Sequence, residues 1–328
     1  MRRTSRILLA SLVLQSTTFA QSDLPSKRGL AFQGDDHTAD SQLLTSAKSL
    51  ISWYYTWSTW PAQALNSSIA FIPLIHGVDD ASDSGLSSRL NVLPESSTHL
   101  LTFNEPDGTT SSGGSSIDPE DAAKAYIEHI VPFRNSGSRK WNISHPVVTG
   151  SSQGIEWLQK FNESCYDIDD NGCPTDFVAV HWYGDATGLK NHLDGLRDFY
   201  NSTSPDLKYW ITEMALPKQD TDATLAMMNE SLTYLDGLDY VEGYAWFGAF
   251  RKDECWYPYY RVANAWTGNS VSLFDGDGGL TDLGALYLGG DERGFEKGQK
   301  GEGNFAGSLS PTRVLLWTTI LAGVATLW

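Results

Sequence analysis

The chain has 328 residues, of which 41% are hydrophobic, and a formal net charge of −17 at pH 7. A chain of this length can bury a sizeable core, and its negative charge would repel nucleic acids and other polyphosphates. The composition therefore predicts a folded protein whose partner is not a polyanion.

The N-terminus has the layout of a secretory signal peptide. Three arginines precede an apolar stretch, residues 7–14, and Ala20 supplies a small residue at the expected cleavage site. The apolar stretch is too short to cross a bilayer, which argues against a membrane anchor. We expect residues 1–20 to be removed, and residues 21–28 to form a short segment that ends in a candidate dibasic processing site.

Eight short apolar segments then follow along the chain. They lack the clean alternation of half-exposed strands, which is typical of strands that are buried on both faces of a parallel sheet. The predicted strands are residues 29–33, 52–57, 69–75, 100–104, 146–150, 177–183, 209–213 and 243–247.

Helical patterns occupy the segments between these strands. Residues 221–238 carry an amphipathic stripe, and Asp118 is placed to cap a helix over residues 119–133. Eight strands alternating with helices over about 260 residues predict a single-domain (β/α)₈ TIM barrel, residues 29–290. A doubly wound open sheet is the alternative, but residues 32–38 lack the Gly-rich phosphate loop that such a sheet usually has there.

The C-terminus is expected to carry a glycolipid (GPI) anchor signal. A Gly-rich linker, residues 291–307, leads to a predicted signal at residues 308–328, whose apolar tail reaches the last residue with no charge after it. The expected attachment site lies between Gly301 and Ser308. The alternative is a plain hydrophobic C-terminus that docks on the domain.

Glycosylation motifs and cysteines agree with a secretory route. The candidate N-glycosylation sites are Asn66, Asn142, Asn162, Asn201 and Asn229. Cys165 and Cys173 flank a turn-like acidic segment and are consistent with a short-loop disulfide, which leaves Cys255 as the odd thiol. We predict no metal and no cofactor, because the cysteines and histidines fit no zinc spacing and the Asp35-Asp36-His37 cluster is more typical of a solvated loop.

Two predicted strands deliver a glutamate at their carboxyl ends. Glu105 follows an apolar strand in LLTFNE, and Glu213 ends the segment KYWITE. In a barrel, polar residues at strand ends line the active face, and paired carboxylates there are what glycosidic bond cleavage requires. The sequence predicts a retaining glycosidase in which Glu105 is the general acid/base and Glu213 the nucleophile. The alternative for Glu105 is a solvated loop residue.

Further residues are predicted to contact a sugar. Asn104 can hydrogen-bond a hydroxyl next to the reacting carbon, and Tyr183 can donate its hydroxyl to Glu213. Aromatic side chains at strand ends can offer a face to a sugar ring, whereas His181 is predicted to be a hydrogen-bonded wall residue and not the base. The predicted substrate-binding residues are Asn104, Tyr183, Trp246, Trp182, Tyr54 and Trp57.

Taken in order, these motifs resemble the fungal glycoside hydrolase family 128, the Asl1-like group of β-1,3-glucanases. The markers are KRGLA (27–31), SWYY (52–55), FIPL (71–74), FNEPD (103–107), DFVAVHWYG (176–184), WITE (210–213) and YAWFG (244–248). The resemblance implies a (β/α)₈ barrel with the acid/base at Glu105 and the nucleophile at Glu213. It also implies that Asn104, Tyr183 and Trp246 are site contacts and that Cys165 and Cys173 are paired.

Two positions depart from the pattern of that family. His76 stands where an aromatic residue is common, and Thr56 stands where asparagine is expected. Both lie near predicted sugar subsites, so they bear on the mode of cleavage, and the family includes endo-acting, exo-acting and oligosaccharide-binding members.

The predicted function is therefore hydrolysis of β-1,3-glucan, with endo action expected. The protein is predicted to be a secreted monomer, GPI-anchored at the cell surface, that takes part in cell-wall remodelling. The alternatives are a glucan-binding surface protein with little turnover and a glucan transglycosylase.

Overall fold

The computed structural model describes residues 24–33, 37–65, 69–135, 139–201, 204–253 and 266–303. The predictions for the leader, for the tail after residue 303, and for Asp35, Asp36, Asn66 and Cys255 lie outside these residues. No helix in the described ranges is both long and apolar enough to cross a membrane.

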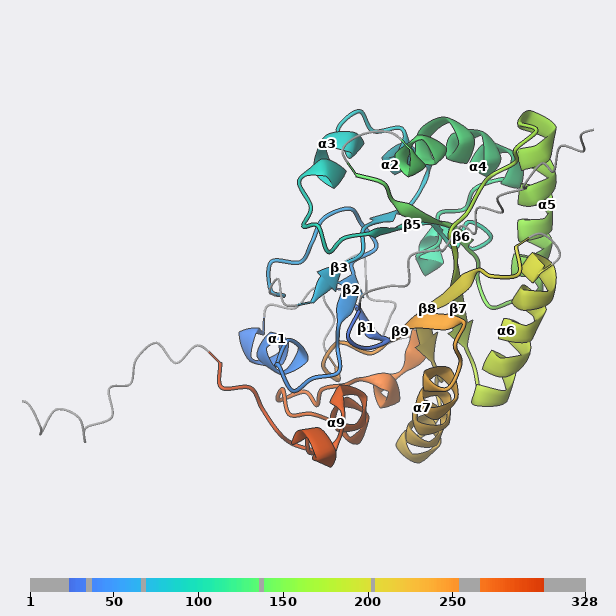
Figure 1. The fold of residues 1–328 in the computed structure, drawn as a ribbon. Coiled ribbons are helices and arrows are strands. Elements are labelled where there is room, and N and C mark those ends of the chain that lie inside the picture. Colours follow the sequence, from blue (N-terminus) through green and yellow to red (C-terminus); the bar gives the residue numbers. More distant parts are fainter. Residues whose placement is uncertain are drawn as a thin grey trace, which may run out of the picture.

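Parallel strands form a single curled sheet at the centre of the described part of the chain (Figure 1). The strands are β1 (Arg28–Ala31), β2 (Trp53–Tyr55), β3 (Ala70–Phe71), β4 (Leu74–Ile75), β5 (His99–Asn104), β6 (Asn142–Val147), β7 (Phe177–Tyr183), β8 (Lys208–Ala215) and β9 (Val241–Trp246). Their order across the sheet is β3-β2-β1-β9-β8-β7-β6-β5-β4. The fold is therefore of the α/β class, as predicted.

The two end strands of the sheet, β3 and β4, are consecutive pieces of one predicted strand. Pro73 interrupts it because proline has no backbone N–H to donate. On one side the Ile72 N–H donates to the carbonyl of Tyr54 in β2, and on the other the Leu101 N–H of β5 donates to the carbonyl of Pro73, both at 2.9 Å.

The predicted strand over residues 146–150 is displaced toward the N-terminus in the structure. Strand β6 begins at Asn142 and includes the polar residues Ser144 and His145, which an apolar pattern passes over. Both are buried and hydrogen-bonded, because the Ser144 Oγ accepts from the Thr102 N–H and the His145 ring contacts the Tyr200 hydroxyl. Polar residues with such partners can occupy an interior strand.

The helices lie around the sheet, with α4 to α7 along one side and α1 and α9 near one another (Figure 1). Their bounds are α1 (Thr38–Leu44), α2 (Val78–Ala81), α3 (Leu86–Asn91), α4 (Pro119–Ala125), α5 (Ser152–Ile168), α6 (Ala186–Asn201), α7 (Thr221–Asp236) and α9 (Asp282–Leu288), and a π-helical turn, η2 (Tyr126–Ile130), continues α4. Asp118 caps α4 as predicted, since its carboxylate accepts from the Glu120 N–H and Pro119 occupies the first helical position.

Two tryptophans fill the interior of the sheet, each opposite a glycine on the neighbouring strand. Trp53 pairs with Gly29 and Trp210 with Gly243, and the two indole centroids lie 4.9 Å apart. A Cβ added at Gly29 would lie 2.1 Å from the Trp53 ring, and one at Gly243 would lie 2.7 Å from Trp210. These glycines are required because the rings occupy the space of a side chain.

The last described segment, residues 295–303, runs back over the domain although it was predicted to be part of a linker. The Gly298 N–H donates to the Leu280 carbonyl, the Leu280 N–H donates to the Gln299 carbonyl, and the Gly303 N–H donates to the Gln42 side chain of α1. We call residues 295–303 the C-terminal strap.

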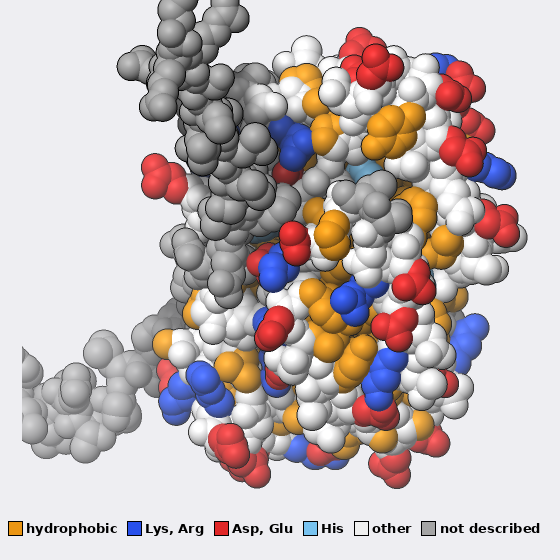
Figure 2. Space-filling model, turned by 45° about the vertical axis from the view of Figure 1, so that its right-hand side comes forward, with side chains coloured by type: hydrophobic (Ala, Val, Ile, Leu, Met, Phe, Trp, Pro, Cys, Tyr) orange, Lys and Arg blue, Asp and Glu red, His pale blue; other side chains and the backbone are white. Residues whose placement is uncertain are grey.

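Acidic and basic side chains are interspersed over the face drawn in Figure 2, around scattered hydrophobic ones. On that face the acidic side chains are therefore spread out and do not gather in a single patch.

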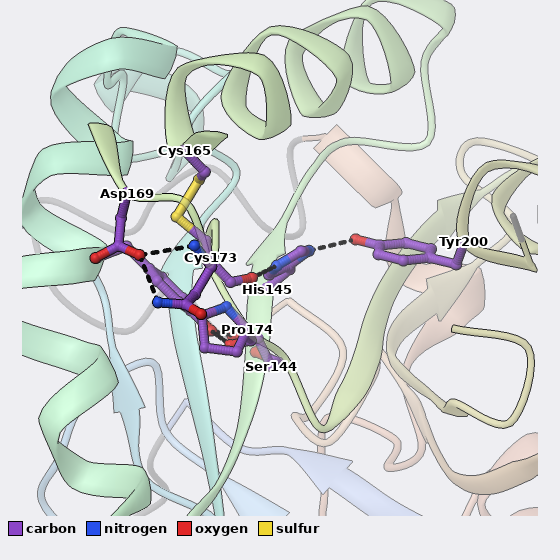
Figure 3. Close-up of a disulfide and its surroundings, with 9 residues drawn as sticks. Ser144, His145, Cys165, Asp169, Cys173, Pro174 and Tyr200 are labelled. Carbon is purple, nitrogen blue, oxygen red and sulfur yellow. Dashed lines mark hydrogen bonds between the residues drawn. A yellow bond between two sulfur atoms is a disulfide. The ribbon is translucent and has the colours of Figure 1, made fainter. Parts of the chain in front are cut away.

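Cys165 and Cys173 form the disulfide that the sequence predicted (Figure 3). It joins the last turn of α5 to the loop before β7. The carbonyl of Cys173 accepts a hydrogen bond from His145 Nε2 at 2.6 Å, and Nδ1 of the same ring contacts the Tyr200 hydroxyl at 3.0 Å. Burial lowers the pKa of His145 to about 4, so the neutral ring is the form that this network holds.

Replacing both cysteines by serine should lower the free energy of unfolding by about 2–3 kcal/mol, because the bridge limits the unfolded chain across a short loop. Urea unfolding of the oxidised protein and of Cys165→Ser/Cys173→Ser measures the difference. The reduced wild type is the matched control, and equal midpoints for the oxidised and reduced forms would contradict the expectation.

Candidate active site

A cleft of about 1740 Å³ lies where the carboxyl ends of the strands meet. Ordinary ligand pockets are about 300–1000 Å³, so this cleft has room for a long ligand. Of the residues predicted from the sequence, those that line it are Glu105, Glu213, Asn104, Tyr183, Trp182 and Trp57.

Glu213 lies in β8 and is 5% exposed. Its Oε1 accepts hydrogen bonds from the Tyr55 hydroxyl at 2.8 Å and from Trp57 Nε1 at 2.7 Å, and its Oε2 accepts from the Tyr183 hydroxyl at 2.5 Å. Burial raises the pKa values of Tyr55 and Tyr183 well above their usual range, so both hydroxyls keep the proton that they donate. The predicted contact between Tyr183 and Glu213 is present.

Opposing effects act on the charge of Glu213. Burial raises its pKa above the ordinary value, and the nearby Glu105 acts in the same direction. His181 and the donors from Tyr183 and Trp57 act in the opposite direction because they favour the carboxylate. These contacts offset part of the effect of burial, and the pKa of Glu213 stays above its ordinary value.

Glu105 follows β5 in a left-handed backbone conformation, with φ of 41°. Its N–H donates to the Val147 carbonyl at 2.7 Å, and its own carbonyl accepts from the Gly108 N–H at 2.9 Å. Such a conformation costs on the order of 1–3 kcal/mol for a residue other than glycine, and it persists only where neighbours hold it. The Glu105 side chain is 14% exposed, which leaves it accessible from the cleft.

His181, in β7, lies between the two glutamates and is fully buried. Its Nδ1 is 2.8 Å from Oε1 of Glu105, and its Nε2 is 3.4 Å from Oε1 of Glu213. Burial would lower the pKa of His181, but the charges of Glu213 and Glu105 outweigh it and raise that pKa above its usual value. Sequence reasoning assigned His181 to the wall and missed this bridge. Its spacing of two residues from Tyr183 was a usable signal, because alternate strand residues share a face.

Tyr55 is a second residue that sequence reasoning missed. Its neighbour Tyr54, predicted to bind substrate, points to the other side of β2, where its ring packs 5.1 Å from that of Phe71 and is 3% exposed. Trp57 reaches Glu213 from a left-handed backbone conformation, with φ of 54°. A strand pattern does not predict that turn.

The other predicted contacts differ in their placement. Trp246 is fully buried, donates from Nε1 to the Val271 carbonyl at 2.8 Å, and is not among the described cleft residues, whereas the adjacent Phe247 is. Asn104 lines the cleft, but its amide donates to the Gly113 carbonyl at 3.1 Å. Trp182 lines the cleft with its ring stacked on His192.

The ligand atoms of Glu105, His181 and Glu213 lie within 4.8 Å of one another, a spacing that a metal site also shows. The surrounding donors do not fit a metal, however. Both oxygens of Glu213 already accept from hydroxyl or indole donors, which leaves fewer lone pairs for a cation. The arrangement fits a hydrogen-bonded pair of acids.

Comparison with known proteins places this geometry in a family. The model described as "Glycosyl hydrolase catalytic core" matches residues 29–287. Alkali-sensitive linkage protein 1 of Schizosaccharomyces pombe is 30% identical over 275 residues, which are 81% of this chain and 45% of that protein. The chain thus spans less than half the length of this curated relative.

Solved structures share the fold. A GH128 subgroup VI exo-β-1,3-glucanase from Aureobasidium namibiae superposes with a TM-score of 0.62 at 20% identity, covering 83% of this chain and 99% of that one. A subgroup I endo-β-1,3-glucanase from Amycolatopsis mediterranei, in complex with laminaritriose, gives a TM-score of 0.54 at 23% identity and covers 68% and 88%. The matched residues include Glu105 and Glu213. The chain belongs to the glycosyl hydrolase catalytic core family, which confirms the resemblance to family 128.

Proposed function

We propose that the protein is a retaining glycoside hydrolase that cleaves β-1,3-glucan. The observation that carries the proposal is that one carboxylate oxygen of Glu105 and one of Glu213 lie within 4.8 Å of each other in the cleft. Retaining enzymes hold the two carboxyl groups about 5–5.5 Å apart, whereas inverting enzymes need roughly 6.5–9.5 Å to admit a water.

The reaction then has two steps. The Glu105 carboxyl gives its proton to the glycosidic oxygen as the bond from that oxygen to C1 breaks, and a Glu213 oxygen bonds to C1. In the second step the Glu105 carboxylate takes a proton from water, the water oxygen bonds to C1, and the bond to Glu213 breaks. Both glutamates return to their starting protonation states.

Two further observations support the substrate and the location. The two solved relatives are named as β-1,3-glucanases, and one of them holds laminaritriose. The predicted leader and anchor signal favour the cell surface, where wall glucan remodelling would be the role. We also propose that β3 and β4 act as the halves of one strand in a closed (β/α)₈ barrel, since their segment hydrogen-bonds to β2 on one side and β5 on the other.

Product analysis tests the proposal. The full chain, secreted from a fungal host, should convert linear β-1,3-glucan to shorter oligosaccharides, and proton NMR should show the β-anomer as the first product. An initial α-anomer would contradict retention. Products longer than the substrate would indicate a transglycosylase, and bound but intact glucan would indicate a binding protein.

Removing the Tyr183 hydroxyl, which contacts Oε2 of Glu213, should shift the pH dependence of kcat/KM. In Tyr183→Phe the carboxylate of Glu213 loses a charge-assisted hydrogen bond worth about 1.5–3 kcal/mol, so its pKa rises further. Because Glu213 must be ionised to attack, the acid limb of the kcat/KM profile should move to higher pH by about one to two units.

The matched control is Tyr126→Phe, which removes a buried hydroxyl whose partners are the Ser144 and Pro174 carbonyls. Its acid limb should stay at the wild-type pH. An unmoved limb in Tyr183→Phe would mean that the hydroxyl does not favour the ionised nucleophile.

A further inference from the structure

We propose that His181 is a positioning residue that serves both glutamates: its Nδ1–H holds Oε1 of Glu105 so that the transferable proton lies on Oε2, while its Nε2–H faces Glu213. The inference rests on the proposed function.

The position of the ring supports this assignment. In the parallel pairing of β7 with β8, His181 lies directly opposite Glu213, and a bulge in β8 sets that register. Nδ1 is 2.8 Å from Glu105 Oε1, and Nε2 is 3.4 Å from Glu213 Oε1, with no closer polar partner within the described part of the chain. Nδ1 therefore hydrogen-bonds Glu105, whereas Nε2 lies near Glu213 without a hydrogen bond in this structure.

Where the ring carries its protons decides what Glu105 can do. If Nδ1 lacked a hydrogen, Glu105 would donate its own proton from Oε1 into the ring, away from the cleft. If Nδ1 carries one, Oε1 is occupied as an acceptor and the acidic proton must sit on Oε2. Only the second arrangement leaves a proton for the glycosidic oxygen.

The reaction itself favours a protonated ring throughout. In the proposed mechanism the negative charge is on Glu213 in the free enzyme and on Glu105 in the glycosyl-enzyme, because Glu213 is then an ester and Glu105 has given up its proton. His181 borders both carboxylates, so an imidazolium pairs with the ionised one at each stage. Other groups also act on this cluster: Asp107 and His192 through electrostatic interaction with His181, and the Tyr55 and Tyr183 hydroxyls and the Trp57 indole through hydrogen bonds to Glu213.

Two variants separate the two contacts. The amide of His181→Asn can stand near the position of Nδ1, whereas that of His181→Gln reaches toward Nε2. Each is assayed on laminarihexaose, whose leaving group needs a proton, and on 2,4-dinitrophenyl β-laminaribioside, whose leaving group does not. We expect His181→Gln to lose at least about 100-fold in kcat/KM on laminarihexaose and less than tenfold on the dinitrophenyl substrate, and His181→Asn to recover most of the loss.

Equal losses on both substrates, or no loss on either, would overturn the proposal. His99→Asn is the matched control: it removes another buried histidine, which packs against Trp210 in the core, and should leave both activities unchanged. Should neither His181 variant fold, nitrogen-15 NMR of the wild type decides, because a ring without a hydrogen on Nδ1 at the working pH contradicts the assignment. If the wild type were inactive on laminarihexaose, that result would instead contradict the proposed function.

A second observation lies outside the cleft. Trp60 is 63% exposed, and its ring has the Arg89 guanidinium 5.5 Å from its centroid. Arg89 is itself fixed by Asp83 at 2.6 Å and by the Thr59 hydroxyl at 3.1 Å. These contacts hold the exposed ring of Trp60 in place, and we call this ring the Trp60 platform.

The segment that carries the Trp60 platform adjoins the cleft. The Thr56 hydroxyl donates to the Trp60 carbonyl at 2.7 Å, and Thr56 lines the cleft beside Trp57, which binds Glu213. We infer that Trp60 stacks on a glucosyl unit of the same glucan chain beyond the cleft.

Chain length tests this inference. Trp60→Ala should raise KM for long β-1,3-glucan about three- to tenfold and leave kcat/KM for laminaritriose unchanged, because the short substrate does not reach the ring. Trp60→Tyr, which keeps an aromatic face, should retain most of the wild-type KM. The same KM as the wild type on long glucan, or an equal effect on laminaritriose, would overturn it.

Discussion

Glu213→Gln should lower kcat/KM on β-1,3-glucan by about 10⁴-fold or more, because the variant cannot form the glycosyl-enzyme. It should nevertheless fold and bind glucan, since the amide oxygen can still accept hydrogen bonds from neighbours such as Tyr55 and Trp57. Initial rates and glucan binding, measured on the same preparation, separate the two effects.

The same variant should be more stable than the wild type at neutral pH. Burial raises the pKa of Glu213, so the folded state loses stability as pH rises from the unfolded-state pKa through the folded one, and glutamine removes that loss. The Tm difference should therefore be positive at pH 7 and shrink below about pH 4.

A suitable control is Glu242→Gln, which changes a buried glutamate near the opposite end of the neighbouring strand β9. Its activity should match that of the wild type. Comparable activity in Glu213→Gln would rule out this residue as the nucleophile.

Glu105→Gln should give a different signature. Loss of the general acid should lower kcat/KM on glucan by about 10²–10⁴-fold. On 2,4-dinitrophenyl β-laminaribioside the first step needs no acid, so the glycosyl-enzyme should form and then accumulate because no base activates water. A burst of dinitrophenolate followed by slow turnover is the expected trace.

Azide should restore turnover in Glu105→Gln, since a nucleophile that carries its own charge needs no base, and the product should be a β-glycosyl azide. Glu213→Gln, which forms no glycosyl-enzyme, should not yield that β product. An equal loss on both substrates without rescue by azide would remove Glu105 from the acid/base role.

Much of the scaffold could be predicted from the sequence because it depends on local patterns. Apolar runs at the correct spacing marked the positions of the strands, and the carboxyl ends of parallel strands meet at one edge, which brought Glu105 and Glu213 together. The strand that was misplaced contains Ser144 and His145. Their hydrogen bonds are made by distant residues, so an apolar pattern could not mark them as interior.

The details of the site were less accessible because they depend on backbone conformations and long-range contacts. Left-handed φ values at Glu105 and Trp57 set the directions of their side chains. The sequence does not indicate these values, because glutamate and tryptophan rarely adopt them. The choice between Tyr54 and Tyr55 depended on which face of β2 turns inward. His181 could be identified as a bridge only when β7 and β8 were in register.

The C-terminal strap has a mechanical consequence. Its contacts follow one another along the chain, from Gly303 on Gln42 back to Gly298 and Gln299 on Leu280. A force applied beyond residue 303 would act on these hydrogen bonds one after another and not on all of them at once. A molecule held by that end would therefore lengthen by releasing the strap first, before the strands that carry Glu105 and Glu213 are disrupted.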